Sequence, residues 1–424
     1  MSRARAASTS RSIMLVLGAF AVLLGTACQQ PQEEMKPFEP KTGKDYTRPL
    51  PPGQLALRKI GPEAYPDFSQ GFNHRAGLED AIRNSLDYLS KPSSKKYYPY
   101  GDVTHERAIA SLKRFLQALQ SAKSGQELDA AIRRDFDVYQ SVGCDDVGTV
   151  LFTGYYCPIF EGRKQRDERF RYPLYKLPPD LVKDAEGKTL GRKLPGGGTG
   201  PYPSRREIDE GRILEGMEIA WLSDPFEAYV CSVQGSAKLR QPDGSLYELG
   251  YAGNNGYTYT PVAEAMIRDG AIRKEDLSLQ TLIRYFKEHP DKVSHYCWQN
   301  PRFIFFREAP GGPFGSLGQP VIPFRSVATD KEVYPRACLA FHDTTIPRLY
   351  QGQIMQMRTG AFVLDQDTGG AIRAAGRCDV FMGIGPDAEA IAGRTLAEGH
   401  LYYVFVKSYG SEQAAATPAP SSGR

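Results

Sequence analysis

Four aspartates lie in a glycine-rich, strand-like segment near the C-terminal end of the chain, and carboxyl groups can serve as general acids and bases. They are Asp365, Asp367, Asp379 and Asp387. Carboxylates beside buried strands need a reason to be there, because burying a charge is unfavourable. Three bulky apolar residues follow Asp379. Such an environment raises the pKa of a carboxyl group towards the working pH of a general acid.

A plainer interpretation is that Asp379 caps a turn or pairs with Arg373 or Arg377, and the residues alone favour it because surface ion pairs are common. Gly369 and Gly370 allow the backbone to approach closely to a ligand or to a neighbouring strand. The residues alone favour the neighbouring strand.

Other chemistries lack their usual motifs. No GxSxG sequence is present and His342-Asp343 is an isolated pair, so hydrolysis by a catalytic triad has little support. The GGGTG stretch from Gly196 lacks the lysine of a phosphate loop. Neither CxxC nor HExxH occurs. The sequence therefore gives no sign of a metal or an organic cofactor.

Aromatic residues make up 11% of the chain, and 24 of them are tyrosines. Flat amphipathic rings suit a sugar-binding groove, although they fill β cores equally well. The tyrosines cluster at Tyr155, Tyr156, Tyr172, Tyr175, Tyr202, Tyr251, Tyr257 and Tyr259.

The spacing of apolar residues predicts the elements that position these groups. Helical spacing runs over Ala76 to Ser90, His105 to Ala118 and Gln126 to Tyr139. Short apolar runs separated by turn residues then predict β structure from Gly148 to Tyr259, including AYVCSVQGSAKL. Two helices are expected over Pro261 to Gly270 and Lys274 to His289, and strands again from Arg302 to Tyr409.

The leader has a basic start, an apolar run from Ile13 to Leu24, and small residues before Cys28. These are the parts of an export signal over residues 1 to 27. The motif resembles the lipobox of bacterial lipoproteins, which implies a lipid anchor at Cys28, although Gly25 stands where the motif usually has Leu. Ordinary signal cleavage is the alternative. Gln29 gives no inner-membrane retention signal, so the periplasmic face of the outer membrane is the expected location.

Composition limits the remaining possibilities. The chain carries a net charge of +4, and loss of the three leader arginines would leave about +1. The excess of basic residues that is typical of nucleic-acid-binding proteins is therefore not apparent. Residues 28 to 53 suit a flexible tether, and residues 410 to 424 suit a disordered tail. Six cysteines remain beyond Cys28, and in an exported chain structural disulfides are the favoured interpretation, with unknown pairing. They are Cys144, Cys157, Cys231, Cys297, Cys338 and Cys378.

Several segments in series resemble the membrane-bound lytic murein transglycosylase A family. They occur in the family's order and cover most of residues 150 to 407. Departures are Cys157, Ala237 and Cys378. The matching stretches are TGYYCPIFEG from Thr153, RYPLYKLPPD from Arg171, YPSRREIDEG from Tyr202, VQGSAKLRQPDG from Val233, YAGNNGYTYTPVAEAMIRDG from Tyr251, NPRFIFFRE from Asn300, LGQPVIPFRSVATD from Leu317 and QDTGGAIRAAGRCDVFMGIGPDAEAIAGR from Gln366.

The resemblance implies a mainly β fold with flanking helices, in which a second, smaller β domain interrupts a double-psi β-barrel. A groove for a glycan strand would lie between the two. Residues 54 to 157 and 311 to 409 would then form the barrel, and residues 158 to 310 the inserted domain.

The resemblance also implies a reaction and its residues. Asp379 falls on the catalytic position and Asp367 on the first aspartate of DxGGAI, while Thr153 and Gln234 fall in the groove. Tyr155, Gly369 and Gly370 are further expected contacts of the substrate. The implied reaction cuts the bond between N-acetylmuramic acid and N-acetylglucosamine in peptidoglycan and leaves a 1,6-anhydro end. The expected role is cell wall turnover, and protein partners stay unknown.

Two alternatives stay open. The chain could be a hydrolase that uses both Asp367 and Asp379 and admits water, as ordinary glycosidases do. It could also be a noncatalytic protein that binds polysaccharide.

Overall fold

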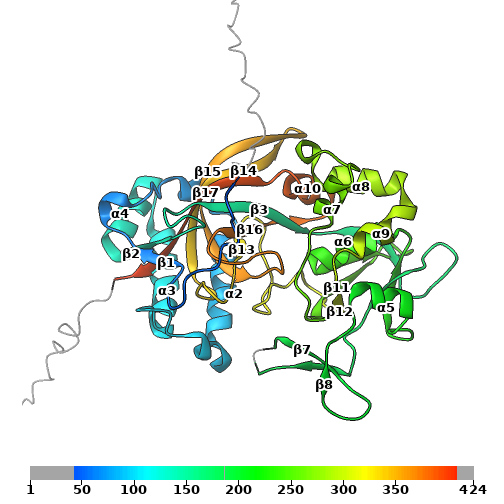
Figure 1. Cartoon of the computed structure of the whole chain (residues 1–424). Coiled ribbons are helices and arrows are strands. Elements are labelled where there is room, and N and C mark those ends of the chain that lie inside the picture. The colour runs from blue at the N-terminus through cyan, green and yellow to red at the C-terminus, as the bar shows by residue number, and fades with distance from the viewer. Residues whose placement is uncertain (1–42, 186, 408–424) are drawn as a thin grey trace, which may run out of the picture. The chain divides into compact units, whose positions relative to one another are not determined.

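A ring of six hydrogen-bonded strands forms the centre of the computed structural model, which describes residues 43 to 185 and 187 to 407 (Figure 1). The order around the ring is β17, β14, β15, β13, β16 and β3, and β3 closes it by pairing with β17. The pairs β13–β15 and β16–β3 are parallel. The strands are β3 (Val150–Cys157), β13 (Ser326–Ala328), β14 (Leu339–Tyr350), β15 (Gln353–Asp367), β16 (Arg377–Ile384) and β17 (Leu396–Val406).

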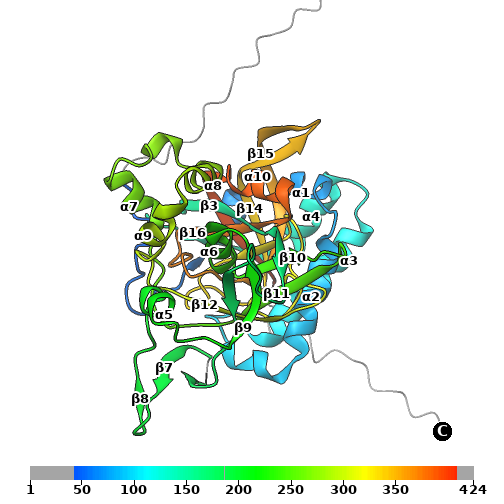
Figure 2. The ribbon, with the colours of Figure 1, turned by 90° about the vertical axis from the view of Figure 1, so that its right-hand side faces the viewer.

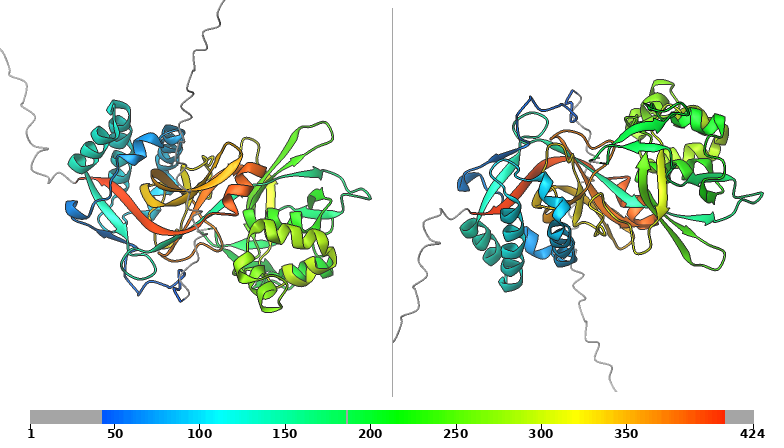
Figure 3. Two further views of the ribbon diagram at one scale, coloured as in Figure 1. Left: turned by 90° about the horizontal axis from the view of Figure 1, so that it is seen from above. Right: turned by 90° about the horizontal axis from the view of Figure 1, so that it is seen from below.

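Helices and two short strands cover one side of this barrel, as the blue and cyan elements of Figure 3 show. Two of the helices begin at side-chain caps, since the hydroxyls of Thr104 and Ser124 each accept a backbone N–H of the first turn. The elements are β1 (Leu57–Lys59), α1 (Gln70–Asn73), α2 (Leu78–Ser90), α3 (His105–Ser121), α4 (Gly125–Asp135) and β2 (Phe136–Ser141). The expected helix over Gln126 to Tyr139 is therefore too long. From Phe136 on, the chain pairs with β17, and this pairing overrides the helical pattern.

A second β region lies between β3 and β13 in the sequence, and its strands pair in two further sheets. The six-stranded sheet contains β12 (Ile304–Glu308), β11 (Leu246–Asn254), β10 (Ser236–Arg240), β4 (Ile159–Arg163), β9 (Glu218–Leu222) and β5 (Tyr172–Tyr175), in that order. The three-stranded sheet contains β6 (Leu181–Lys183), β7 (Thr189–Lys193) and β8 (Thr199–Gly200). Figure 2 shows β7 and β8 set apart from the other green strands. The predicted mainly β fold, with flanking helices and a barrel interrupted by a second β region, is confirmed.

Helices pack on this second region, and one of them corrects the sequence interpretation. The run AYVCSVQGSAKL is not all strand, because its first half belongs to α6 (Pro225–Gln234). Asp224 caps this helix, and Gly235 ends it with a φ of 73°. The other helices are α5 (Arg205–Gly211), α7 (Val262–Arg268), α8 (Leu279–Glu288) and α9 (Val293–Cys297), and α10 (Pro386–Ala392) follows β16 in the barrel region.

The expectation of disulfides is wrong, because all six cysteines named above are free and buried. Four of them lie on different elements, Cys144 and Cys338 lie in the segments before β3 and β14, and all six pack as small, mainly apolar side chains. Buried free cysteine commonly packs in this way.

The N-terminal end of the described chain packs on the barrel region, although the sequence assigns it to a tether. Tyr46 donates a 2.7 Å hydrogen bond to Glu398, and Lys44 lies 3.1 Å from the same carboxylate. The expected leader, the lipidation site Cys28 and the expected tail from 410 lie outside the described residues. None of the helices in the described part of the chain combines the length and hydropathy needed to cross a membrane.

Candidate active site

Four residues form a row across the barrel wall, one on each of four neighbouring strands. Thr153 of β3 pairs with Asp379 of β16, Asp379 pairs with Ala328 of β13, and Ala328 pairs with Asp367 of β15. Paired residues on adjacent strands place their side chains on the same face of a sheet. The fold therefore brings together three of the predicted site residues from widely separated parts of the sequence.

Alternation along β16 places Asp379 on the outer face of the barrel. Its neighbours Cys378 and Val380 are fully buried members of the main core, whereas Asp379 is partly exposed. The apolar residues next to Asp379 in sequence thus mostly point away from it. Phe381, two residues on, shares its face and lies with its ring centroid 5.2 Å from that of Tyr155.

Asp379 has the electrostatic character of a general acid. Burial raises its pKa from 3.8 to about 6, and the nearby charge of Asp367 acts in the same direction. Arg377 and the Thr153 hydroxyl partly offset this by lowering the pKa. Asp379 Oδ1 is buried and has no hydrogen-bond partner among the described residues. A buried carboxyl oxygen without a partner is unusual and marks this position as a functional candidate.

Arg377 is a functional candidate that the sequence interpretation treated only as a possible ion-pair partner. Its Nη2 donates a 3.1 Å hydrogen bond to Thr153 Oγ1, and its buried Nε has no partner in the described chain. Arg373, the other proposed partner of Asp379, instead lies 3.9 Å from Asp330. The spacing of Arg377 and Asp379, two residues apart in a strand, is the signal that could have placed both on one face.

The surroundings of Arg377 include a residue from the second β region. Burial lowers the pKa of the Arg377 guanidinium, while the charge of Asp379 and the nearby Tyr259 side chain act in the opposite direction. Tyr259 lies in the segment before α7. Side chains from both parts of the chain therefore act on the same cation.

Asp367 differs from Asp379 because its carboxylate is fully engaged. Oδ1 accepts hydrogen bonds of 2.8 Å from the backbone amides of Ser316 and Thr368, and Oδ2 accepts one of 2.8 Å from the Tyr155 hydroxyl. Burial raises the pKa of Asp367, and these three donors lower it. The hydroxyl of Tyr155 is thus committed to Asp367.

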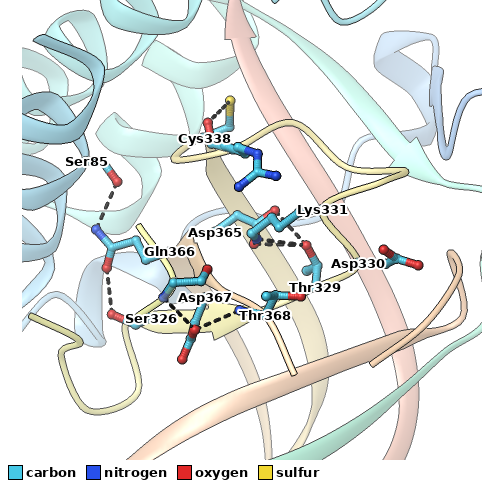
Figure 4. A network of polar contacts seen from close by, with 12 residues as sticks. Ser85, Ser326, Thr329, Asp330, Lys331, Cys338, Asp365, Gln366, Asp367 and Thr368 are labelled. Carbon is cyan, nitrogen blue, oxygen red and sulfur yellow. Dashed lines mark hydrogen bonds and ion pairs between the residues drawn. The ribbon is translucent and has the colours of Figure 1, made fainter. Parts of the chain in front are cut away.

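A β-bulge in β15 puts Asp365 and Asp367 in different environments. Val327 pairs with Asp365 but Ala328 pairs with Asp367, so Gln366 is an extra residue in β15. The Gln366 side chain accepts a hydrogen bond from the Ser326 hydroxyl and donates one to Ser85, as Figure 4 shows.

Asp365 lies inside the barrel in a closed polar network. It accepts a hydrogen bond from the Tyr403 hydroxyl. Figure 4 shows that it also accepts one from the Thr329 hydroxyl and forms an ion pair with Lys331. Its side chain is 0% exposed, so it is a structural group rather than a candidate catalyst.

Two other predicted site residues, Gln234 and Gly370, lie where the second β region meets the barrel region. Gln234, the last residue of α6, accepts a 3.1 Å hydrogen bond from the backbone amide of Tyr156. A Cβ atom on Gly370 would come within 3.0 Å of Arg302 Nε, so this glycine admits an arginine side chain. At Gly369 the nearest atom would be Ile372 Cγ1, at 3.1 Å. Gly370 therefore faces a side chain rather than the neighbouring strand that the residues alone favoured.

No group of three or more His, Cys, Asp or Glu side chains in the described ranges is arranged to hold a metal ion. The chemistry that the site offers is proton transfer by a carboxyl group of raised pKa, beside a guanidinium and a hydroxyl.

Comparisons with known proteins show what the chain as a whole resembles. Residues 151–307 match the family model described as the MltA specific insert domain, and residues 325–405 match the model of the 3D domain. The chain is 27% identical over 383 residues to a protein of Escherichia coli strain K12 named membrane-bound lytic murein transglycosylase A. The match covers 89% of this chain and 92% of that protein.

Solved structures share the fold. A membrane-bound lytic murein transglycosylase from Agrobacterium tumefaciens matches with a TM-score of 0.68 at 24% identity, over 83% of this chain and 98% of the other. The structure of E. coli MltA with bound chitohexaose matches with a TM-score of 0.63 at 24% identity, over 87% and 97% of the two chains.

Proposed function

The chain belongs to the membrane-bound lytic murein transglycosylase A family, and we propose that it cuts peptidoglycan glycan strands with Asp379 as its acid and base catalyst. The bond cleaved is the β-1,4 bond between N-acetylmuramic acid and N-acetylglucosamine. The carboxyl group of Asp379 carries this assignment, because it combines a pKa of about 6 with a buried, unpartnered oxygen.

The reaction needs only one protein carboxyl group. Protonated Asp379 gives its proton to the glycosidic oxygen as the bond from that oxygen to C1 of the muramic acid breaks. The resulting carboxylate then takes the proton from the C6 hydroxyl of the same sugar, whose oxygen attacks C1 and closes the 1,6-anhydro ring. Asp379 ends protonated and no water is consumed. A tethered hydroxyl has a high effective concentration, so a second carboxylate is unnecessary.

Arg377 and Thr153 assist the two proton transfers. The positive charge of Arg377 favours the ionised form of Asp379, which exists between the first transfer and the second. Thr153 holds the guanidinium by its 3.1 Å hydrogen bond and also lowers the pKa of Asp379. Both residues therefore stabilise the ionised form of Asp379 that exists between the two proton transfers.

Asp367 supports the site rather than sharing the acid role. Its two oxygens already accept three hydrogen bonds, so it is poorly placed to activate water. This argues against the hydrolase with two catalytic carboxylates. We assign Asp367 the role of holding Tyr155, whose ring lies against Phe381 on the strand that carries Asp379.

The remaining contacts with the glycan are assigned by position. Thr153 and Gln234 would bond hydroxyl or acetamido groups of the sugars, and Tyr155 would offer the face of its ring. Gly369 and Gly370 would line the same groove beside Arg302. We place the barrel domain at residues 54 to 157 and 311 to 409 and the inserted domain at residues 158 to 310.

The decisive experiment is digestion of purified peptidoglycan followed by mass analysis of the products. The wild type should release fragments with 1,6-anhydro ends, and Asp379→Asn should release none while still binding the sacculi. Asp387→Asn, an exposed aspartate on α10, is the matched control and should cleave normally. Hydrated ends alone would support the hydrolase, and no release by the wild type would support a protein that only binds polysaccharide.

The relatives are named membrane-bound, and we propose that this chain is attached through a lipid on Cys28, at the periplasmic face of the outer membrane. The Cys28→Ser variant should then move from the membrane pellet to the soluble fraction or stay unprocessed. A wild type that is wholly soluble would contradict the anchor.

A further inference from the structure

A cluster of basic side chains lies around one end of β13, and the proposed glycan cleavage does not use it. Arg325, just before β13, is 4% exposed, and Arg348 of β14 is half-buried. His342 of β14 is 1% exposed, and His74, which ends α1, is half-buried. Arg325 and Arg348 both lower the pKa of each histidine, after the larger effect of burial. The ring of Phe324, the residue before Arg325, lies 3.8 Å from the guanidinium carbon of Arg348, so Arg348 lies beside the segment that carries Arg325.

The two arginines lack a negative partner. No ion pair within the described chain joins a carboxylate to Arg325 or Arg348, and burial lowers the pKa of both guanidinium groups. Glu79 and Asp80, in the first turn of α2, pair with Arg83 of the same helix. Buried charges are normally paired with an opposite charge. Because Arg325 is buried and has no carboxylate partner in the described chain, a bound anion would be its natural partner.

Two nitrogen atoms of the cluster also lack hydrogen-bond partners. Arg325 donates through Nη1 to the carbonyl of Phe362 at 2.9 Å, but its buried Nε has no partner in the part of the chain described. The buried Nδ1 of His342 is likewise without one. An acceptor with negative charge would satisfy the arginine, because a guanidinium presents a planar fork that fits two oxygen atoms.

The backbone holds this cluster in a strained form. Phe324 has a φ of 61°, in the left-handed region that bulky residues avoid. Its ring lies 3.8 Å from the guanidinium carbon of Arg348 and so fixes that side chain. The Phe324 amide donates a 2.7 Å hydrogen bond to the carbonyl of Phe381, two residues from Asp379. Such strain is often found at ligand sites.

We propose that Arg325 and Arg348 form a binding site for an oxyanion, a carboxylate or phosphate group, with Arg325 at its floor and Arg348 at its entrance. The oxyanion comes either from a small free ion such as inorganic phosphate or from a carboxylate of the substrate's peptide stem. The site is separate from Asp379, and anion binding needs no turnover.

Thermal unfolding in inorganic phosphate tests the site, with chloride used to hold the ionic strength constant. The wild type should show a saturable rise in Tm, because a ligand that binds only the folded state stabilises it. Arg348→Gln should need at least about tenfold more phosphate for the same rise, since a charged hydrogen bond is lost. Arg348→Lys keeps the charge without the planar fork and should fall between the two.

Arg358→Gln is the matched control, because Arg358 lies on the same hairpin but pairs with Asp343 at 2.8 Å. This variant should respond to phosphate as the wild type does. The proposal is overturned if the wild type shows no saturable rise beyond chloride, or if Arg348→Gln and Arg348→Lys both respond as the wild type does.

The source of the oxyanion is tested with the Asp379→Asn variant, which separates binding from cleavage. A disaccharide with its peptide stem is titrated with and without phosphate, beside the same disaccharide with its stem carboxylates amidated. Tighter binding of the free stem, together with competition by phosphate, identifies a substrate carboxylate. Equal binding of both disaccharides, with phosphate still stabilising the protein, identifies a small free ion.

Discussion

Asp367 and Asp379 pair with the same residue, Ala328, from opposite sides of strand β13. Adjacent strands are about 4.8 Å apart, so the two aspartates are separated by about 10 Å of barrel wall. One carboxylate is held by three donors, whereas the other has an oxygen with no partner in the described chain. This asymmetry favours the proposed roles, in which Asp367 supports the site and Asp379 transfers protons.

Asp379→Asn is expected to make the folded protein more stable at neutral pH while removing activity. The pKa of Asp379 is raised from 3.8 to about 6, so the folded state holds this proton more tightly than the unfolded chain does. The stability that comes from this tighter proton binding is fully present below pH 3.8 and is lost as the pH rises through about 6. A shift of two pKa units corresponds to about 3 kcal/mol, which partial exposure reduces to about 1 to 2 kcal/mol.

Denaturant unfolding at several pH values measures this effect. Asp379→Asn should exceed the wild type by about 1 to 2 kcal/mol at pH 7.5, and the difference should vanish as the pH falls below 4. Asp387→Asn, at an exposed position, should show no such trend. A gain that is the same at every pH would rule out ionisation as its cause.

Arg377→Gln and Asp367→Asn are expected to move the pH dependence of kcat/KM in opposite directions. The active free enzyme holds Asp379 protonated, so activity falls as the pH rises through about 6. Arg377 lowers the pKa of Asp379, so its removal should shift this fall to higher pH. Asp367 raises the same pKa, so its neutralisation should shift the fall to lower pH.

The controls for this pair are Arg373→Gln and Asp387→Asn, which remove equivalent charges elsewhere. Neither should displace the pH profile. If Arg377→Gln lowers the rate but does not shift the pH profile of kcat/KM, the arginine acts only on the fold.

The sequence predicted the elements whose signals are local. The spacing in α2 and α3 indicated helices because their apolar residues recur on one face, and the structure has them within a few residues of the predicted bounds. The family resemblance predicted the catalytic role of Asp379, whereas the residues alone favoured a turn cap or an ion pair. The apolar run in α6 was ambiguous, yet Asp224-Pro225 before it and Gly235 after it are the start and stop signals of a helix.

Other features depend on contacts that no local pattern contains. Phe136 to Tyr139 continue a helical pattern, but pairing with β17 makes them a strand. The even count of cysteines suggested disulfides, whereas the fold leaves all six free at separate buried positions. The cluster of Arg325 with Arg348 joins residues on different elements through the ring of Phe324. Only the fold reveals that Arg348 lies against the residue that precedes Arg325.

Tyr155→Phe is expected to lower both stability and activity. The change removes the donor of the 2.8 Å hydrogen bond to Asp367 Oδ2 and leaves that carboxylate oxygen without its side-chain partner. The free energy of unfolding should fall by about 1 to 3 kcal/mol. Because the Phe381 contact is kept, KM should change less than kcat. Tyr172→Phe, on β5 of the second β region, is the control, and an equal loss there would contradict a specific role for Tyr155.

Lys331→Met is expected to destabilise the barrel without any direct contact to the site. Lys331 is the cation paired with Asp365, and the two side chains are 5% and 0% exposed. Removing one partner leaves an uncompensated charge inside the protein, which costs about 3 to 5 kcal/mol of the free energy of unfolding. The double variant Lys331→Met with Asp365→Asn should recover part of this loss, because the amide carries no charge. If the two single losses simply add in denaturant unfolding, the pair is not coupled. If the double variant is restored yet Asp379 chemistry stays impaired, Asp365 also positions Asp367 through their shared strand β15.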